Sequence, residues 1–97
     1  MTRVDAPLRR TAGFVHRNVA GEALLIPVGA RPSALQSAYL LNPTAECVYL
    51  NLDGRRDAAE LAGLLAKAFG ADAAEASRDV RELLETLAGI GAVEPAP

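Results

Sequence analysis

The chain changes its pattern of apolar and polar residues near its middle, from short apolar runs to a helical spacing. Two runs, residues 14–19 and 22–28, are rich in β-branched, aromatic and aliphatic side chains and are joined by Ala20-Gly21, which predicts a β-hairpin. A loop of Gly, Arg and Pro follows at 29–33, and a third short strand is expected at 38–41. The first half therefore predicts a small antiparallel sheet.

Three helices are expected in the second half. Asn42-Pro43 supplies an N-cap and a proline at the first helical position, which predicts a helix over 44–52. Asp57 with Glu60 has the form of a capping box before a helix that ends at Gly70, and Asp72 with Glu75 repeats this pattern before the last helix. The expected core-facing residues are Ala45, Val48, Tyr49 and Leu52 in the first helix, Ala58, Leu61, Ala62, Leu65 and Phe69 in the second, and Val80, Leu84 and Leu87 in the third, flanked by Leu83 and Ile90.

Strands first and helices after indicate an α+β fold. We expect a winged-helix-like domain in which a three-stranded antiparallel sheet is followed by three α-helices. The 97 residues suffice for one domain. Residues 1–12 are polar and contain Pro7 and Arg9-Arg10, so they are expected to form a flexible N-terminal arm before a folded domain at 13–94.

The composition is that of a globular protein, with 51% apolar and 23% charged residues. A net charge of −2 lacks the basic footprint of a nucleic-acid binder. Cys47 is the only cysteine, so no intrachain disulfide can form, and a reducing cytoplasmic setting fits. We expect neither a secretory signal nor a membrane span, because no apolar run is long enough.

Residues that could carry chemistry are few. His16 is the only histidine and has no neighbouring cluster of ligands, so a structural or solvent-facing role is favoured over a metal site. Cys47 lies near a helix start, where a thiol can be activated, but a small buried apolar side chain is the commoner role. No nucleotide-binding or catalytic motif occurs. We therefore expect no catalytic residues, no cofactor and no enzymatic activity.

Several short segments, taken in their order and spacing, resemble the PqqD-like family. The resemblance begins with Gly21-Glu22-Ala23-Leu24-Leu25 in the hairpin and continues through Leu41-Asn42-Pro43-Thr44-Ala45, Leu52-Asp53-Gly54-Arg55-Arg56, Ala59-Glu60-Leu61-Ala62, Phe69-Gly70, Asp79-Val80 with Leu83-Leu84 and Leu87, and Gly91-Ala92-Val93-Glu94. It spans about residues 14–94. Asn51 and Tyr49 depart from the pattern, because that family usually has an apolar residue and a tryptophan or aliphatic residue at these positions.

The resemblance implies a non-catalytic recognition element for ribosomally synthesised and post-translationally modified peptides (RiPPs). Such domains, including PqqD in pyrroloquinoline quinone (PQQ) biosynthesis, hold the leader segment of a precursor peptide and present it to a modifying enzyme, often a radical SAM enzyme. The leader adds as a strand beside the third strand and lies against the third helix. In this chain the implied peptide-binding residues are Ser37, Ala38, Tyr39, Leu40 and Leu41 on the strand and Arg78, Arg81, Glu82, Leu83 and Glu85 on the helix.

Four alternatives stay open at this point. A winged-helix fold can also belong to a DNA-binding regulator, although the acidic charge opposes it. The domain can instead be an adaptor that binds only the enzyme, and the four charged residues of the last helix can be merely solvated. An exposed strand edge can also pair with a second copy and give a homodimer.

Overall fold

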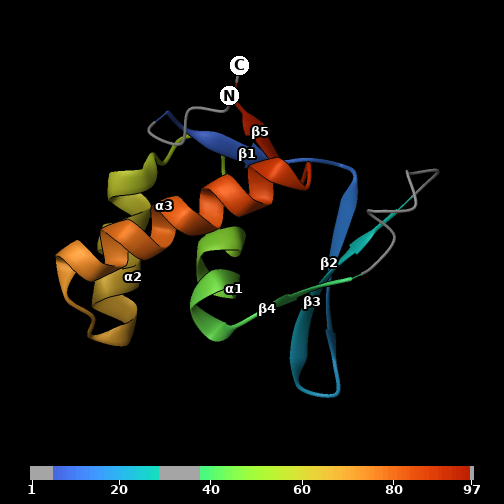
Figure 1. Cartoon of the computed structure of the whole chain (residues 1–97), viewed down its shortest axis with the longest axis horizontal. Helices are drawn as coiled ribbons and strands as arrows, with labels where there is room; N and C mark the ends of the chain where they lie inside the picture. Colours follow the sequence, from blue (N-terminus) through green and yellow to red (C-terminus); the bar gives the residue numbers. More distant parts are fainter. Residues whose placement is uncertain (1–5, 29–37, 97) are drawn as a thin grey trace.

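The computed structural model describes residues 6–28 and 38–96, and these residues form two small sheets and three helices (Figure 1). The main sheet contains β2 (Phe14–Val19), β3 (Glu22–Pro27) and β4 (Tyr39–Leu41), all antiparallel, in the order β2-β3-β4. The helices α1 (Pro43–Leu50), α2 (Ala58–Phe69) and α3 (Ala73–Gly89) follow. The predicted α+β fold, with a three-stranded antiparallel sheet before three helices, is confirmed.

The hairpin between β2 and β3 closes at the predicted position. Val19 pairs with Glu22, and the two residues between them have φ angles of 52° and 83°. Two consecutive positive φ angles define the turn whose twist matches that of the flanking strands, and the second position is a glycine, which adopts such angles without strain.

The start of each helix is fixed by the residues that the sequence indicated. The Asn42 side chain accepts a hydrogen bond from the amide of Ala45. Asp57 and Glu60 form the reciprocal capping box, and Asp72 accepts from the amides at positions 74 and 75. Gly70 ends α2 in the left-handed conformation. These caps satisfy amides and carbonyls that a helix cannot pair internally.

The core lies between one face of the main sheet and the three helices. Its largest fully buried side chains come from both sheets, from α2 and α3 and from the α1–α2 loop; they are Leu8, Leu25, Leu52, Leu61, Leu84, Leu87 and Val80. Every other expected core-facing residue of the helices is buried, with one exception. Phe69 is 46% exposed, because it lies beyond Leu65 and Ala66, the last residues of α2 that contact the core.

A second sheet joins the two ends of the described chain. Strand β1 (Leu8–Arg10) pairs antiparallel with β5 (Val93–Pro95). Leu8 is only 1% exposed, and Arg9 forms an ion pair with Glu94 at 2.7 Å. This differs from the expectation that residues 1–12 form a flexible arm, since residues 8–10 are hydrogen-bonded strand and contribute to the core. Residues 1–5 lie outside the described part.

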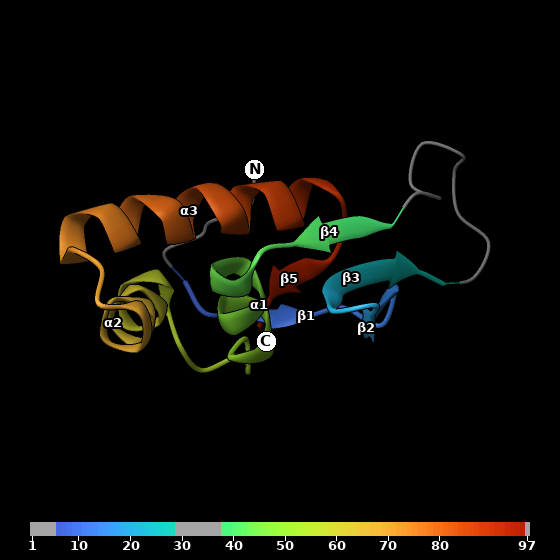
Figure 2. The ribbon, with the colours of Figure 1, turned by 90° about the horizontal axis from the view of Figure 1, so that it is seen from below.

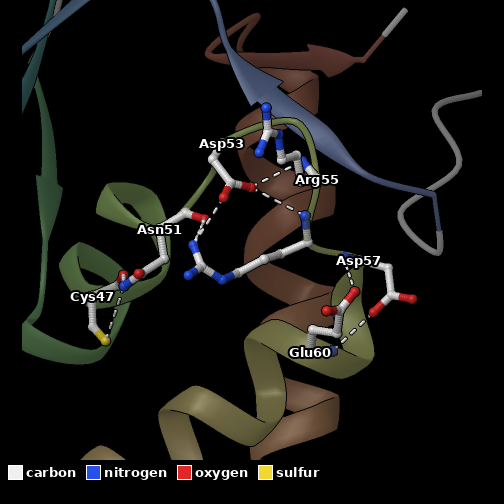
Figure 3. A network of polar contacts seen from close by, with 7 residues as sticks. Cys47, Asn51, Asp53, Arg55, Asp57 and Glu60 are labelled. Atoms are coloured by element: carbon white, nitrogen blue, oxygen red, sulfur yellow. Dashed lines mark hydrogen bonds and ion pairs between the residues drawn. The ribbon is translucent and has the colours of Figure 1, made fainter.

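A polar network orders the loop between α1 and α2 (Figure 3). One carboxylate oxygen of Asp53 accepts the amides of Arg55 and Arg56 at 2.9 and 3.1 Å, and the other pairs with the Arg56 guanidinium at 3.0 Å. Arg56 also donates to the carbonyl of Asn51, whose side chain donates to the carbonyl of Cys47. The hydrogen bond from the Arg55 amide is the main cause that lowers the pKa of Asp53 below its usual 3.8.

Replacing Asp53 with alanine is expected to lower the free energy of unfolding at neutral pH. Because the native-state pKa of this carboxyl is lowered, its stabilising effect is fully present above the ordinary pKa of 3.8 and is lost as the pH falls through the native value. Urea unfolding of both proteins at a series of pH values measures this. The wild-type advantage should shrink in acid, whereas Glu85→Ala, which removes an exposed carboxylate from α3, serves as control. A difference that is the same at every pH would contradict the assignment.

Candidate functional site

The main sheet presents an open edge at β4. Strand β3 is central, so β4 is paired on one side only in the described sheet. Alternate residues of an edge strand direct their N–H and C=O groups away from the sheet, where they can pair with another chain. Figure 2 shows this edge and α3 on the same side of the molecule.

The side chains of β4 point to opposite faces of the sheet. Leu41 is buried with its partner Ala23, so this face covers the core. Leu40 pairs with Leu24 on the other face and is 58% exposed. Leu40 also lines a hollow of about 220 Å³ that reaches the turn of the hairpin. If another chain added a strand to this edge, alternate side chains of that strand would face the helices, and the others would lie beside Leu40.

A groove of about 330 Å³ continues from the end of β4 between α1 and α3. It is lined by Asn42, Thr44, Ala45 and Val48 at the start of α1, by Asp79, Val80, Glu82, Leu83 and Thr86 on α3, and by Leu65 of α2. The apolar members are buried or half-buried, whereas Asp79, Glu82 and Thr86 are exposed. The groove therefore has an apolar floor and a polar rim, which is the usual character of a binding site.

Helix α3 presents different residues on its two flanks. Those that line the groove, at 79, 82, 83 and 86, follow the i, i+3, i+4, i+7 spacing of one helical face. Arg78, Arg81 and Glu85 do not line it. With 3.6 residues per turn, Arg81 projects from the other side of the buried stripe, whereas Arg78 and Glu85, four residues before and three residues after Glu82, lie next to it on the solvent face of α3.

The predicted site residues are therefore only partly brought together. Glu82 and Leu83 lie in the groove, and Tyr39, Leu40 and Leu41 form the adjacent strand, preceded by an exposed Ala38. Ser37 lies outside the described residues. Sequence reasoning did not assign the other eight lining residues to the site, namely Asn42, Thr44, Ala45, Val48, Leu65, Asp79, Val80 and Thr86. The helical spacing around Leu83 could have identified Asp79 and Thr86.

His16 has a structural setting. Its Nε2 lies 2.7 Å from a carboxylate oxygen of Glu46, which ties β2 to the first turn of α1. The ring stacks on Tyr49 with centroids 6.1 Å apart, and the Arg10 guanidinium lies 5.6 Å from the centre of the Tyr49 ring. Burial raises the pKa of the Tyr49 hydroxyl, with a smaller opposing effect of Arg10. These contacts bear out the structural role predicted for His16.

Cys47 is partly buried against the core rather than fully buried. Its sulfur lies 3.9 Å from the side-chain nitrogen of Asn51. Among the described residues, no group of three or more His, Cys, Asp or Glu side chains is arranged to hold a metal ion. No helix in residues 6–28 and 38–96 is long and apolar enough to cross a membrane.

Known proteins share this architecture. The family model described as "Coenzyme PQQ synthesis protein D (PqqD)" matches residues 22–93. The solved structure of TbiB1 in complex with the TbiA(beta) leader peptide has a TM-score of 0.69 at 16% identity, over 89% of this chain and 94% of that chain. The structure of a lasso peptide synthetase B1 complexed with the leader peptide has a TM-score of 0.73 at 20% identity, over 93% and 100% of the two chains. No curated protein matches.

Proposed function

Since the chain belongs to the PqqD family, we propose that it is a non-catalytic RiPP recognition element that binds the leader segment of a precursor peptide and presents it to a separate modifying enzyme. The observation that carries this proposal is the open edge of β4 beside a groove with an apolar floor. Two structures of the same fold that contain leader peptides support it. A radical SAM enzyme in a cytoplasmic RiPP or PQQ-type pathway is the partner that the family favours.

The proposed mode of binding is addition of the leader as a fourth strand. Its backbone would pair with Ala38–Leu41, an interaction that needs only exposed N–H and C=O groups and so tolerates many sequences. Side chains on one face of this strand would enter the groove and contact Leu83, and those on the other would lie beside Leu40. Arg78, Arg81 and Glu85 are left out of this proposed surface because they do not line the groove.

Backbone pairing alone is too weak for this task. Each hydrogen bond contributes about 0.5–1.5 kcal/mol net, so four or five give about 2–7 kcal/mol. Micromolar affinity requires about 8 kcal/mol, and ordering the peptide has a further cost. The groove must therefore supply the remaining affinity, which explains why an apolar floor next to the strand edge matters.

A titration tests the proposal. The full chain is mixed with the labelled precursor peptide encoded beside its gene, and fluorescence anisotropy measures the dissociation constant. We expect micromolar affinity or better, and loss of binding when the leader is removed. No binding better than millimolar would overturn the proposal.

Two further experiments test the alternatives, an adaptor that binds only the enzyme and a DNA-binding regulator. An adaptor that binds only the enzyme would retain the enzyme in a pull-down without capturing the precursor. A DNA-binding regulator would retard random duplex at low salt. The carboxylates of Asp79 and Glu82 beside the groove oppose the second alternative, because they would repel phosphate groups.

A further inference from the structure

The charged residues with which α3 lines the groove are both acidic. Asp79 and Glu82 line the groove, and Glu75, one turn before Asp79, is exposed on the same flank. Arg81 projects from the opposite flank, and Arg78, four residues before Glu82, lies next to Glu82 on the solvent face without lining the groove. The wall of the groove formed by α3 is therefore acidic although the helix as a whole contains both signs of charge.

No basic side chain of the described chain lines the groove beside this acidic wall. The residues that line the groove include no lysine, arginine or histidine. The ion pairs within residues 6–28 and 38–96 join Arg9 to Glu94, His16 to Glu46 and Arg56 to Asp53. Neither Asp79 nor Glu82 is a partner in these pairs.

The carboxylates lie directly beside the apolar floor. Leu83 adjoins Glu82 in sequence and follows Asp79 by one helical turn, and Val48 faces the same space from α1. A ligand side chain that fills the floor therefore brings its neighbours within reach of two negative charges. Opposite charges at such a distance attract, and a lysine or arginine stem can pack along the apolar surface while its head reaches a carboxylate.

The distance along α3 from Asp79 to Leu83 matches the distance between alternate side chains of an extended peptide. One helical turn from Asp79 to Leu83 covers about 6 Å along α3. Alternate residues of a strand are about 6.6 Å apart and point to the same side. In Figures 1 and 2, β4 and α3 run roughly along the same line in opposite directions, so a strand added to β4 would also follow α3.

We propose that this groove selects leader segments in which a lysine or arginine stands two positions from a large apolar residue. The apolar side chain occupies the floor at Val48 and Leu83, and the basic side chain pairs with Asp79 and Glu82. This inference rests on the proposed function, because it names the chemistry of the peptide that the site accepts. The contribution is one of selectivity, since charge pairs at a partly exposed rim add modest affinity.

A displayed library of random peptides tests the inference without knowledge of the natural precursor. The immobilised full chain should enrich peptides with an apolar residue and a Lys or Arg two positions away. The double variant Asp79→Lys, Glu82→Lys should enrich Asp or Glu at the basic position and keep the apolar one. It should bind peptides selected by the wild type about tenfold more weakly.

The matched control is the same substitution at a glutamate of α3 that does not line the groove. Glu82→Lys should weaken binding of a selected peptide about threefold, whereas Glu85→Lys, the same change outside the groove, should alter it less than twofold. The variant Asp79→Asn, Glu82→Gln repeats the test without introducing positive charge if the lysine variant does not fold.

The outcomes separate the two levels of the proposal. If the wild type enriches no peptide at all, the proposed function itself fails. If peptides with an apolar anchor are enriched but the basic residue is not, or if the lysine variant keeps the wild-type preference, peptide recognition stands and the charge rule is overturned.

Discussion

Replacing Leu8 with alanine is expected to lower the free energy of unfolding by about 2–5 kcal/mol. Leu8 is 1% exposed and belongs to the hydrophobic core, so the shortened side chain leaves a cavity that its neighbours cannot fill completely. A domain of 97 residues has a stability of only about 5–15 kcal/mol. The loss is therefore a large part of the total and is measurable by urea unfolding.

The control for this substitution is Leu50→Ala. Leu50 lies at the end of α1 and is 49% exposed, so the same chemical change there should cost well under half as much. If Leu8→Ala proves as mild as Leu50→Ala, strand β1 does not contribute to the core in solution, and the chain before Gly13 is the arm that its composition indicates.

Replacing Leu83 with glutamate is expected to abolish most of the peptide affinity while the domain stays folded. The change removes an apolar surface from the floor of the groove and adds a third carboxylate beside Asp79 and Glu82. Burying a leucine side chain contributes about 1.5–3 kcal/mol, so its loss alone weakens binding about tenfold to a hundredfold. Anisotropy with the labelled precursor measures the effect.

An equivalent substitution outside the groove gives the comparison. Leu64 is a leucine of α2 that is 36% exposed and does not line the groove. Leu64→Glu should bind the peptide with wild-type affinity, and circular dichroism should show both variants folded. Equal losses in the two variants, or none in Leu83→Glu, would remove the groove from the binding surface.

The sequence predicted the helices well because their signals are local. Caps at Asn42, Asp57 and Asp72 and the stop at Gly70 depend only on neighbouring residues, and the structure bears them out. The hairpin turn is local in the same way. Phe69 was assigned to the core because it continues the apolar spacing, but spacing alone does not reveal where the partner surface ends.

Strand β1 could not be predicted for a physical reason. It is three residues long, two of them are arginines, and its partner β5 lies more than 80 residues away, so neither alternation nor a nearby turn marks it. The stability of such a strand comes from the tertiary pairing and the burial of Leu8, and not from its own propensity.

The candidate site likewise has a part that the sequence indicated and a part that depends on tertiary packing. The family resemblance indicated the third strand and the last helix, and the open edge at β4 is where it was expected. The choice among the charged residues of α3 needed the structure, because the side of the buried stripe that faces the groove depends on how α1 and α3 pack. Asp79 and Thr86 line the groove, whereas Arg78, Arg81 and Glu85 do not, and the peptide-binding role of these three stays a prediction.

The most direct test of the account is an NMR titration of the ¹⁵N-labelled chain with the precursor peptide. We expect the largest amide shifts at Ala38–Leu41 on the strand edge and at residues 79–86 of α3, together with slowed hydrogen exchange of the outward-facing amides of β4. Shifts that cluster instead on the outer face of α2, or an unchanged spectrum at saturating peptide, would contradict the claim that this edge and groove bind the leader.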